Sequence, residues 1–414
     1  MRATTLLNRV LNFSGASITR VEFGGHGPVV ATVKLTARKK LSCPHCPYAT
    51  KAGYDTRWAE STWRHLDLGG TALVLKMLRR RLRCPEHGVV VQSVPFARPN
   101  SRFTKDFEDL VAWLVTRTDK SSVSAFARVA WRTVGAICER VVADQLDDTR
   151  FENLVHLGVD EISWKKHHNY LTLVSDHETS TILWGAAGKN AATLDQFFKR
   201  IGPENTQNIE AVSMDMGAAF IKSVSKNAPQ AAICIDPFHV VQIATKALET
   251  VRRSFWQQAR TLPDQSFAKK YKGNRYALLK NPDKLNDKQQ ATLEQMKKDG
   301  GELWEAYQLK EALREVFAGD LETKDVMDMI QDWCHAATTS GMAPFMKAAA
   351  TLRGHINGIY EAVTRKLSNG KHEGLNNKIR TMTRRSYGFH SAEATLALIM
   401  LACGPVTTKL PYQK

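Results

Sequence analysis

The stretch LVHLGVDEISWKKHHNYLTLVSD, residues 154–176, joins an apolar run that ends in a carboxylate to a second run rich in β-forming residues. The apolar run has the composition of a strand buried on both faces, and it stops at Asp160. The second run, residues 170–174, predicts a partner strand, with a hairpin through residues 165–169. A carboxylate at this position indicates either an ordinary turn or a metal site, and Asp160 alone does not decide between them.

Two further apolar runs end in an aspartate, and each is followed by a helical pattern. NIEAVSMD ends at Asp215, and AAICID ends at Asp236, directly before Pro237. Strands that alternate with helices predict an α/β sheet, in which residues at the carboxyl ends of the strands face the ligand-binding crevice. Asp236 would serve equally well as the cap of the helix that follows, so Asp236 and the nearby His239 are second-tier candidates.

The composition of the chain favours an anionic partner. The 414 residues include 58 Lys+Arg and 41 Asp+Glu, a formal net charge of +17, and their length predicts about two to four domains. Nucleic acid is the leading partner, because the basic residues are spread along the chain instead of lying on one membrane-binding helix. We find no signal peptide or apolar run long enough to span a bilayer, and the odd count of seven Cys fits reduced thiols. We therefore expect a cytoplasmic protein with no membrane contact.

Two short motifs, CPHC and RCPEHG, lie about 40 residues apart and predict a zinc site. Their ligands would be Cys43, Cys46, Cys84 and His87. Four unrelated thiols and imidazoles are the alternative, but two pairs with this spacing rarely fall by chance in one short domain. Since the protein would fill all four positions of the tetrahedron, the zinc would stabilise the fold and leave no place for a reacting water.

A basic run directly precedes the second zinc motif. It is either a solvated face or a surface that contacts DNA phosphates, and its position beside a zinc ribbon favours the second reading. The residues of this run are Arg79, Arg80, Arg81 and Arg83.

A helical period begins near residue 102 and continues to about residue 145. The segment SSVSAFARVAWRTVGAICERVV predicts two helices with a break near Ala130 and Trp131, and Thr133 as the cap of the second. This is the spacing of a helix-turn-helix, in which residues 134–142 would enter a major groove and Arg132 would contact DNA. An ordinary pair of short helices is the alternative.

Residues 241–367 contain no convincing strand and predict a long helical insertion. The segment SNGKHEGLNNKIRTMTRRSYGF then predicts a helix whose apolar stripe docks on the sheet, while Glu373 and Asn376 lie on another face. That polar face is either plainly solvated or holds a metal ion and the phosphates of the same strand. The arginines of this helix expected to contact DNA are Arg380, Arg384 and Arg385.

The chemistry that three separated carboxylates would support is metal-assisted phosphoryl transfer. Mg²⁺ prefers hard oxygen ligands, and a pair of ions activates a water or a DNA 3′-hydroxyl on one side and stabilises the leaving oxygen on the other. The expected ligands are Asp160, Asp215 and Glu373, with Glu161 and Asp176 as competing carboxylates. The chain has neither the phosphate-binding loop of ATP-driven motors nor a G-x-S-x-G nucleophile elbow.

These motifs together resemble the DDE transposases of bacterial insertion sequences, and within them the ISL-three family. The segments that carry the resemblance are CPHC with RCPEHG, GVDEISWKK, SMDMGAAF with IDPFHVV, YALLKNPDKL through AYQLKEALREVF, and SNGKHEGLNNKIRTMTRRSYGF, which follow the family's order over nearly the whole chain. The family typically has Cys at the fourth zinc position, where this chain has His87. Because His also binds zinc, this departure is compatible with the metal site.

The resemblance implies an α/β fold, a ribonuclease-H-like catalytic core interrupted by an all-α insertion and preceded by a zinc ribbon and a helix-turn-helix. It places the DDE acids at Asp160, Asp215 and Glu373, with Mg²⁺ or Mn²⁺ as catalytic ion and Zn²⁺ as structural ion. The expected domains are a zinc-binding DNA-binding domain at 1–100, a helix-turn-helix domain at 101–150, the first part of the core at 151–240, the insertion at 241–367, and the final core helices at 368–414.

The resemblance and the three acids together predict a transposase. Such an enzyme would bind the terminal inverted repeats of double-stranded element DNA, cleave the ends, and join the 3′-hydroxyls to target DNA. Such an enzyme would work in the bacterial cytoplasm, associated with the nucleoid, as a homodimer or larger assembly. A sequence-specific DNA-binding regulator derived from a transposase and a structure-selective nuclease are the alternatives. The presence of all three acids favours the transposase, since an inactive remnant has no reason to keep them.

Overall fold

The computed structural model describes residues 2–25, 27–36, 40–165, 169–261, 273–319, 321–367, 370–386, 391–408, 410 and 413, with backbone only for 370–373. The chain forms two compact units. Unit 1 comprises Met1–Arg150 and Ile379–Lys414, and unit 2 comprises Phe151–Lys378. The sequence-based division assigned residues 368–414 to the catalytic core, whereas the packing groups residues 379–414 with the amino-terminal part of the chain.

Unit 1 begins with an amphipathic helix that the sequence patterns did not indicate, followed by a small sheet. Its strands follow the order β1-β2-β6-β5, with β7 paired to β6 and a separate β3-β4 hairpin. Alternate residues of β6 point inward, so Leu73 and Leu75 pack with Trp63 and Phe96 in the core of this sheet. The elements are α1 Ala3–Leu11, β1 Ala16–Phe23, β2 Val29–Leu35, β3 Leu41–Ser42, β4 Ala49–Thr50, β5 Trp58–Arg64, β6 Leu73–Cys84 and β7 Gly88–Val91.

Three helices follow in unit 1: α2 Lys105–Val115, α3 Lys120–Ala127 and α4 Trp131–Gln145. The predicted break between α3 and α4 is present, but the cap of α4 is Ala130 and not Thr133. Asp119 caps α3 by accepting hydrogen bonds from two backbone N–H groups. Helix α16, Ala392–Cys403, packs against α4 and α2.

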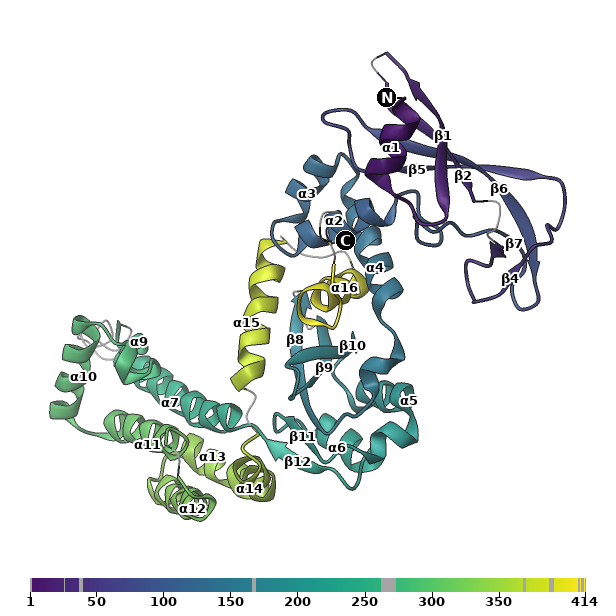
Figure 1. The fold of residues 1–414 in the computed structure, drawn as a ribbon. Helices are drawn as coiled ribbons and strands as arrows, with labels where there is room; N and C mark the ends of the chain where they lie inside the picture. The colour runs from purple at the N-terminus through teal and green to yellow at the C-terminus, as the bar shows by residue number, and fades with distance from the viewer. Residues whose placement is uncertain are drawn as a thin grey trace. The chain divides into compact units, whose positions relative to one another are not determined.

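Unit 2 is built on one mixed sheet with the strand order β10-β9-β8-β11-β12 (Figure 1). Strands β8 and β9, both within residues 154–176, pair antiparallel. Strand β11 pairs in parallel with β8, and β12 pairs in parallel with β11. Parallel neighbours require crossover connections, which helices supply here. The strands are β8 His156–Lys165, β9 Asn169–Asp176, β10 Thr181–Ala187, β11 Ala211–Met214 and β12 Ala232–Ile235.

Helices bury the faces of this sheet. The side chains of α5, Ala191–Gln207, and α6, Ala218–Asn227, share one core with β8, β9 and β11. Helix α14, Ile356–Thr364, packs on β12, where a Cβ at Gly358 would lie 3.2 Å from the carbonyl oxygen of Ile233. Glycine at this position therefore permits the close approach of helix and strand.

The part of residues 241–367 that the structure describes contains helices and no strand. Helix α7 leads from the end of β12 into this region, as Figure 1 shows. A short turn of 3-10 helix, Pro282–Lys284, interrupts these helices before a capping box at Asn286. The helices are α7 Pro237–Ala259, α9 Arg275–Leu279, α10 Asp287–Asp299, α11 Glu302–Val316, α12 Thr323–Thr339 and α13 Ala343–Gly354.

Candidate catalytic and zinc sites

The parallel pairing of β8 and β11 brings two of the predicted acids together. Ser213 of β11 pairs with Gly158 of β8. Asp160 lies two residues beyond Gly158 within β8, and Asp215 directly follows Met214, the last residue of β11. Continuing the same register by two residues would set Asp215 opposite Asp160, on the same face of the sheet.

Asp236 directly follows the next strand, β12, and we call Asp160, Asp215 and Asp236 the row of acids. Met214 pairs with Ile235, and the backbone N–H of Asp236 donates to the carbonyl oxygen of Met214 across 3.1 Å. Asp236 therefore follows β12 as Asp215 follows β11. It is 1% exposed, and its carboxylate caps α7 by accepting a hydrogen bond from the backbone N–H of Phe238. The predicted capping role of Asp236 is confirmed.

The conformation of Asp215 depends on the glycine that follows two residues later. The backbone N–H of Gly217 donates to Oδ1 of Asp215 across 2.9 Å. A Cβ at Gly217 would lie 2.7 Å from the same oxygen. Any larger residue at position 217 would therefore displace the carboxylate that it now orients.

Helix α15, Gly370–Arg385, provides a direct contact to Asp160. Nδ2 of Asn376 donates a hydrogen bond to Oδ2 of Asp160, and Oδ1 of the same carboxylate accepts from the backbone N–H of Glu161. Glu373 lies on α15, but its side chain is outside the described residues. The sequence had placed Asn376 on the polar face of this helix without assigning it a contact to Asp160.

The remaining predicted carboxylates differ in their surroundings. Burial raises the pKa of Glu161, and the nearby carboxylates of Asp215 and Asp160 raise it further, while Lys189 and His239 oppose them. Glu161 is therefore part of the same electrostatic site. Asp176 instead accepts hydrogen bonds from the backbone N–H groups of residues 178 and 179, so its carboxylate holds the β9–β10 turn.

Among the described side chains, one group of three or more metal-binding residues has ligand atoms within 4.8 Å of one another, and it is the predicted zinc quartet. Sγ of Cys46 lies 3.5 Å from Sγ of Cys84, which lies 3.6 Å from Nδ1 of His87, and Cys43 lies 3.9 Å from the same nitrogen. Zinc bonds of about 2.0–2.3 Å in a tetrahedron require ligand separations of about 3.5–3.8 Å. The donor set and its spacing therefore fit a structural zinc ion.

The local folding of two hairpins produces this quartet. Cys43 and Cys46 lie in the turn between β3 and β4, and Cys84 ends β6 just before the β6–β7 turn that carries His87. Cys43 and Cys84 are buried with Leu41 and Leu82 in a separate small core. A core with so few apolar side chains would provide little stability to this ribbon without a metal ion.

The four arginines of the basic run have different roles in the structure. Arg79 is half-buried, donates to Oγ of Ser61, and lies over the Trp63 ring, and Arg81 forms an ion pair with Asp55. Both guanidinium groups thus have protein partners. Arg80 lies over the ring of Trp58, and Arg83 is exposed near Tyr54.

The remaining arginine candidates lie on helices. Arg132, in the first turn of α4, is exposed, as are Arg380 and Arg384 on α15. Arg385 instead donates a hydrogen bond to the carbonyl oxygen of Thr116 at the end of α2, so part of its donor capacity is used within the protein.

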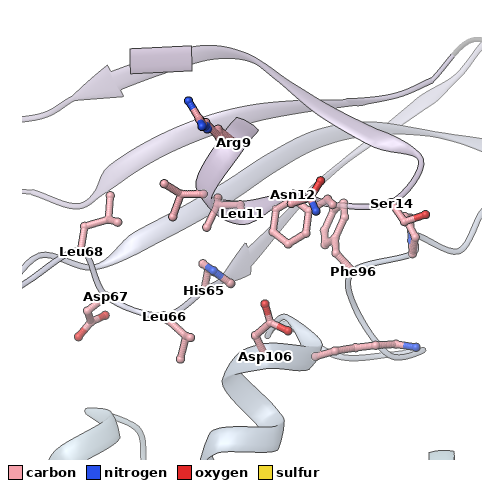
Figure 2. Close-up of a pocket in the computed structure, with 14 residues that line it drawn as sticks. Arg9, Leu11, Asn12, Ser14, His65, Leu66, Asp67, Leu68, Phe96 and Asp106 are labelled. Carbon is pink, nitrogen blue, oxygen red and sulfur yellow. The ribbon is translucent and has the colours of Figure 1, made fainter. Parts of the chain in front are cut away.

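A cavity of about 680 Å³ in unit 1 is shown in Figure 2, and its lining includes none of Asp160, Asp215 and Asp236. Arg9 and Lys105 contribute positive charge to its lining, and Asp67 and Asp106 contribute negative charge. His65 in its wall bonds through Nδ1 to Oγ1 of Thr104 across 2.8 Å. This balance of charge does not favour a phosphate ligand, and we assign the cavity no role.

The zinc quartet, the helix-turn-helix and the aligned carboxylates place the chain in the class of DNA-binding proteins with a candidate metal-dependent site. The chain matches a family model described as transposase over residues 157–399, the helix-turn-helix domain of transposase family ISL3 over 92–142, and the zinc-finger of transposase IS204/IS1001/IS1096/IS1165 over 39–87. The chain thus belongs to the ISL3 family of insertion-sequence transposases.

The chain is also similar to curated transposases over most of their lengths. The chain is 38% identical over 411 residues to the transposase for insertion sequence element IS1557 from two strains of Mycobacterium tuberculosis, covering 94% of this chain and 91% of the relative. It is 26% identical over 391 residues to the transposase for insertion sequence element IS1001 of Bordetella parapertussis, covering 94% and 95%. No helix in the described part of the chain is long and apolar enough to span a membrane.

Proposed function

We propose that the protein binds the terminal inverted repeats of its insertion sequence, cleaves the element ends and joins the freed 3′-hydroxyls to target DNA. Asp160, Asp215 and Glu373 would form the catalytic centre. The observation that supports this proposal is the parallel pairing of Gly158 with Ser213, whose continuation by two residues would bring Asp215 opposite Asp160. Two carboxylates close together in this way would be suited to hold a divalent ion.

The position of Asn376 supports Glu373 as the third acid. Residues three apart on a helix lie on the same face, and Glu373 precedes Asn376 by three residues on α15. Since Asn376 bonds to Asp160, a helical spacing of three residues would place Glu373 on the side of α15 that faces the proposed catalytic acids.

The residues fit Mg²⁺ or Mn²⁺, because carboxylate oxygens are the ligands that these ions prefer. When bound, a pair of ions would activate a water or a 3′-hydroxyl and stabilise the leaving oxygen. Asn376 would hold the carboxylate of Asp160 in one rotamer, and Gly217 would do the same for Asp215. Asp236 would fix the start of α7, which places His239 beside the row.

We propose that the two units have different functions. Unit 2 would provide a ribonuclease-H-like catalytic core with an all-α insertion. Unit 1 would bind double-stranded DNA through the zinc ribbon and α4, with Arg132 at the groove. Arg80 and Arg83 would contact phosphates, as would the α15 arginines, whereas the ion pair of Arg81 and the burial of Arg79 give these two residues structural roles. The family likeness supports action as a homodimer or larger assembly on paired ends in the bacterial cytoplasm, close to the nucleoid.

A strand-transfer assay tests this function. Purified protein is incubated with labelled element-end duplex, a target plasmid and Mg²⁺, and cleaved and joined products are separated on a gel. Joined product supports the transposase, cleavage without joining supports a structure-selective nuclease, and binding alone supports a DNA-binding regulator derived from a transposase.

Substitutions test the assignment of the acids in the same assay. We expect Asp160→Asn, Asp215→Asn and Glu373→Gln to abolish cleavage and leave end binding intact, while the matched change Asp328→Asn on α12 has no effect. Cleavage at the wild-type rate by the Glu373 variant would remove that residue from the proposed centre.

A further inference from the structure

Two attachments join the sheet of unit 1 to its helix-turn-helix, and the first lies where β5 ends and α2 begins. The backbone N–H of Arg64 donates to the carbonyl oxygen of Arg102 across 2.8 Å, and the backbone N–H of Thr104 donates to the carbonyl oxygen of Arg64 across 3.0 Å. Thr104, which caps α2, is also hydrogen-bonded through Oγ1 to the buried His65. The start of α2 is therefore fixed to the sheet.

The second attachment reaches the turn between α3 and α4. Asp67, which Figure 2 shows beyond His65 on the loop between β5 and β6, accepts hydrogen bonds from the guanidinium groups of Arg64 and Arg128. Arg128 also donates to the carbonyl oxygen of Gly70 across 3.2 Å. Arg128 caps the end of α3, directly before the turn that leads into α4. We call these contacts of Asp67 and Arg128 the Asp67 bridge.

The exposure of the Asp67 bridge indicates an orienting role and not a folding role. A body held at one attachment can rotate about it, and a second attachment removes that freedom. The side chains of Asp67 and Arg128 are 26% and 47% exposed, and neither residue belongs to the apolar core of the sheet. Because exposed ion pairs contribute little to stability, loss of the bridge should leave the sheet and the helices folded and loosen only the connection between them.

The connection between the sheet and the helices affects DNA binding if both contact one duplex. Arg83 of the sheet and Arg132 of α4 are exposed, and both are proposed DNA contacts. Two contacts on one rigid body strengthen each other, because the second forms without a further loss of freedom. That gain requires a matching spacing on the DNA, since each added base pair moves one contact by about 3.4 Å and rotates it by about 35° around the duplex.

We propose that Asp67 and Arg128 are positioning residues that hold α4 at a fixed distance and angle from the zinc-ribbon sheet. Unit 1 then recognises the element end as one two-part site of defined spacing. This inference rests on the proposed end binding and adds a spacing requirement to it. The direction of the expected effect separates the inference from simple electrostatics. A carboxylate near DNA repels phosphates, so its removal alone would strengthen binding, whereas loss of the bridge should weaken binding.

The first experiment measures the affinity of the zinc-loaded, full-length protein for an end duplex at constant salt, without Mg²⁺ so that the DNA stays intact. We expect Asp67→Asn to weaken binding by about 5- to 25-fold, since each of its two ion pairs contributes up to about fivefold. Asp67→Glu keeps the charge and should retain most of the affinity. The matched control is Glu22→Gln, which breaks an exposed ion pair with Arg20 inside β1 and should bind at least as tightly as wild type. Thermal unfolding checks that each variant is folded.

The second experiment tests the spacing directly. A footprint of the wild-type protein on the end duplex should show two protected segments, and Arg83→Ala and Arg132→Ala should each weaken protection of a different one. One base pair is then inserted between the two segments. We expect the insertion to weaken wild-type binding strongly and to weaken binding by Asp67→Asn much less, because the helices of that variant can reorient to fit the altered duplex.

The possible outcomes separate this inference from the proposed function. Binding of the original end by Asp67→Asn that is as tight as wild type, or tighter, would overturn the inference. An equal loss by both proteins on the altered duplex, or a single protected segment, would do the same. Failure of the wild-type protein to bind the end at all would instead overturn the proposed function, and this inference with it.

Discussion

Asn376 donates a hydrogen bond from Nδ2 to Oδ2 of Asp160, a residue 216 positions earlier in the chain. The contact joins α15 to β8, the middle strand of the five-stranded sheet of unit 2. Oδ1 of Asp160 accepts a hydrogen bond from the backbone N–H of Glu161. An amide that orients one carboxylate oxygen restricts the rotamers of the whole group, which is what a metal ligand on a rigid scaffold requires.

Replacing Asn376 with Ala should slow end cleavage by about 10- to 150-fold, since a hydrogen bond to a charged group contributes about 1.5–3 kcal/mol. End binding should be unchanged, because the amide bonds to the protein itself. Cleavage rate and binding affinity are measured on the same end duplex. The control is Asn357→Ala, an exposed amide on α14. Unaltered cleavage by the Asn376 variant would show that the contact does not orient Asp160.

The zinc ribbon should depend on its metal ion. We expect about one zinc per chain by elemental analysis, and Cys43→Ser should lose most of it. Because the small core of the ribbon needs the ion to fold, the variant should also lower the melting temperature of unit 1 and weaken DNA binding. Cys138→Ala, a buried thiol of α4 outside the quartet, should keep its zinc. Zinc content at the wild-type level in the Cys43 variant would remove that residue from the ligand set.

Unit 1 should depend on a buried ion-pair network centred on Arg98. Its guanidinium contacts Glu108 at 3.2 Å, Asp109 at 2.7 Å and Asp144 at 2.9 Å, and the side chains of Arg98 and Glu108 are 3% and 0% exposed. The network ties the segment before α2 to both α2 and α4.

Arg98→Met should destabilise this unit by about 3–5 kcal/mol, because it leaves buried carboxylates without their positive partner. Thermal and urea unfolding measure the effect, and Arg102→Met, at an exposed position nearby, serves as the control. A loss no larger than that of the control would show that Arg140, which also pairs with Glu108, is sufficient.

Unit 2 should show an acid-dependent stability that comes from Asp195. Hydrogen bonds from Ser223, and then from Lys226 and Asn227, lower the pKa of this carboxyl below its ordinary 3.8. The folded state therefore binds the proton more weakly than the unfolded state. The stabilisation is fully present above about pH 3.8 and is lost as the pH falls through the folded pKa.

Asp195→Asn should be less stable than wild type at pH 6, and the difference should shrink as the pH is lowered below 3.8. Urea unfolding over this range measures it, with Asp328→Asn as a control. A difference that stays constant with pH would mean that the hydrogen bonds stabilise the protonated carboxyl equally.

Much of the architecture was predictable because the patterns are local. The structure confirms the predicted strands that end just before Asp215 and Asp236. The strand predicted to stop at Asp160 instead continues to Lys165, because its pairing with β9 extends that far. Helix α1 was not predicted, and its first residue follows Arg2, which provides no side-chain cap to mark the start of a helix. The cap of α4 was misplaced by three residues, since Ala130 carries no side-chain oxygen to mark it.

The sequence by itself determined the family, the zinc ligands and the acids to consider, because spacing within a motif and apolar periodicity are properties of the chain alone. Only the tertiary structure decided that β11 pairs in parallel with β8, that Asn376 reaches the carboxylate of Asp160, and that Arg79 and Arg81 contact Trp63 and Asp55 within the fold. These relationships depend on strand register and on contacts between residues far apart in the chain. A one-residue slip in register would turn the acids to opposite faces without changing any motif.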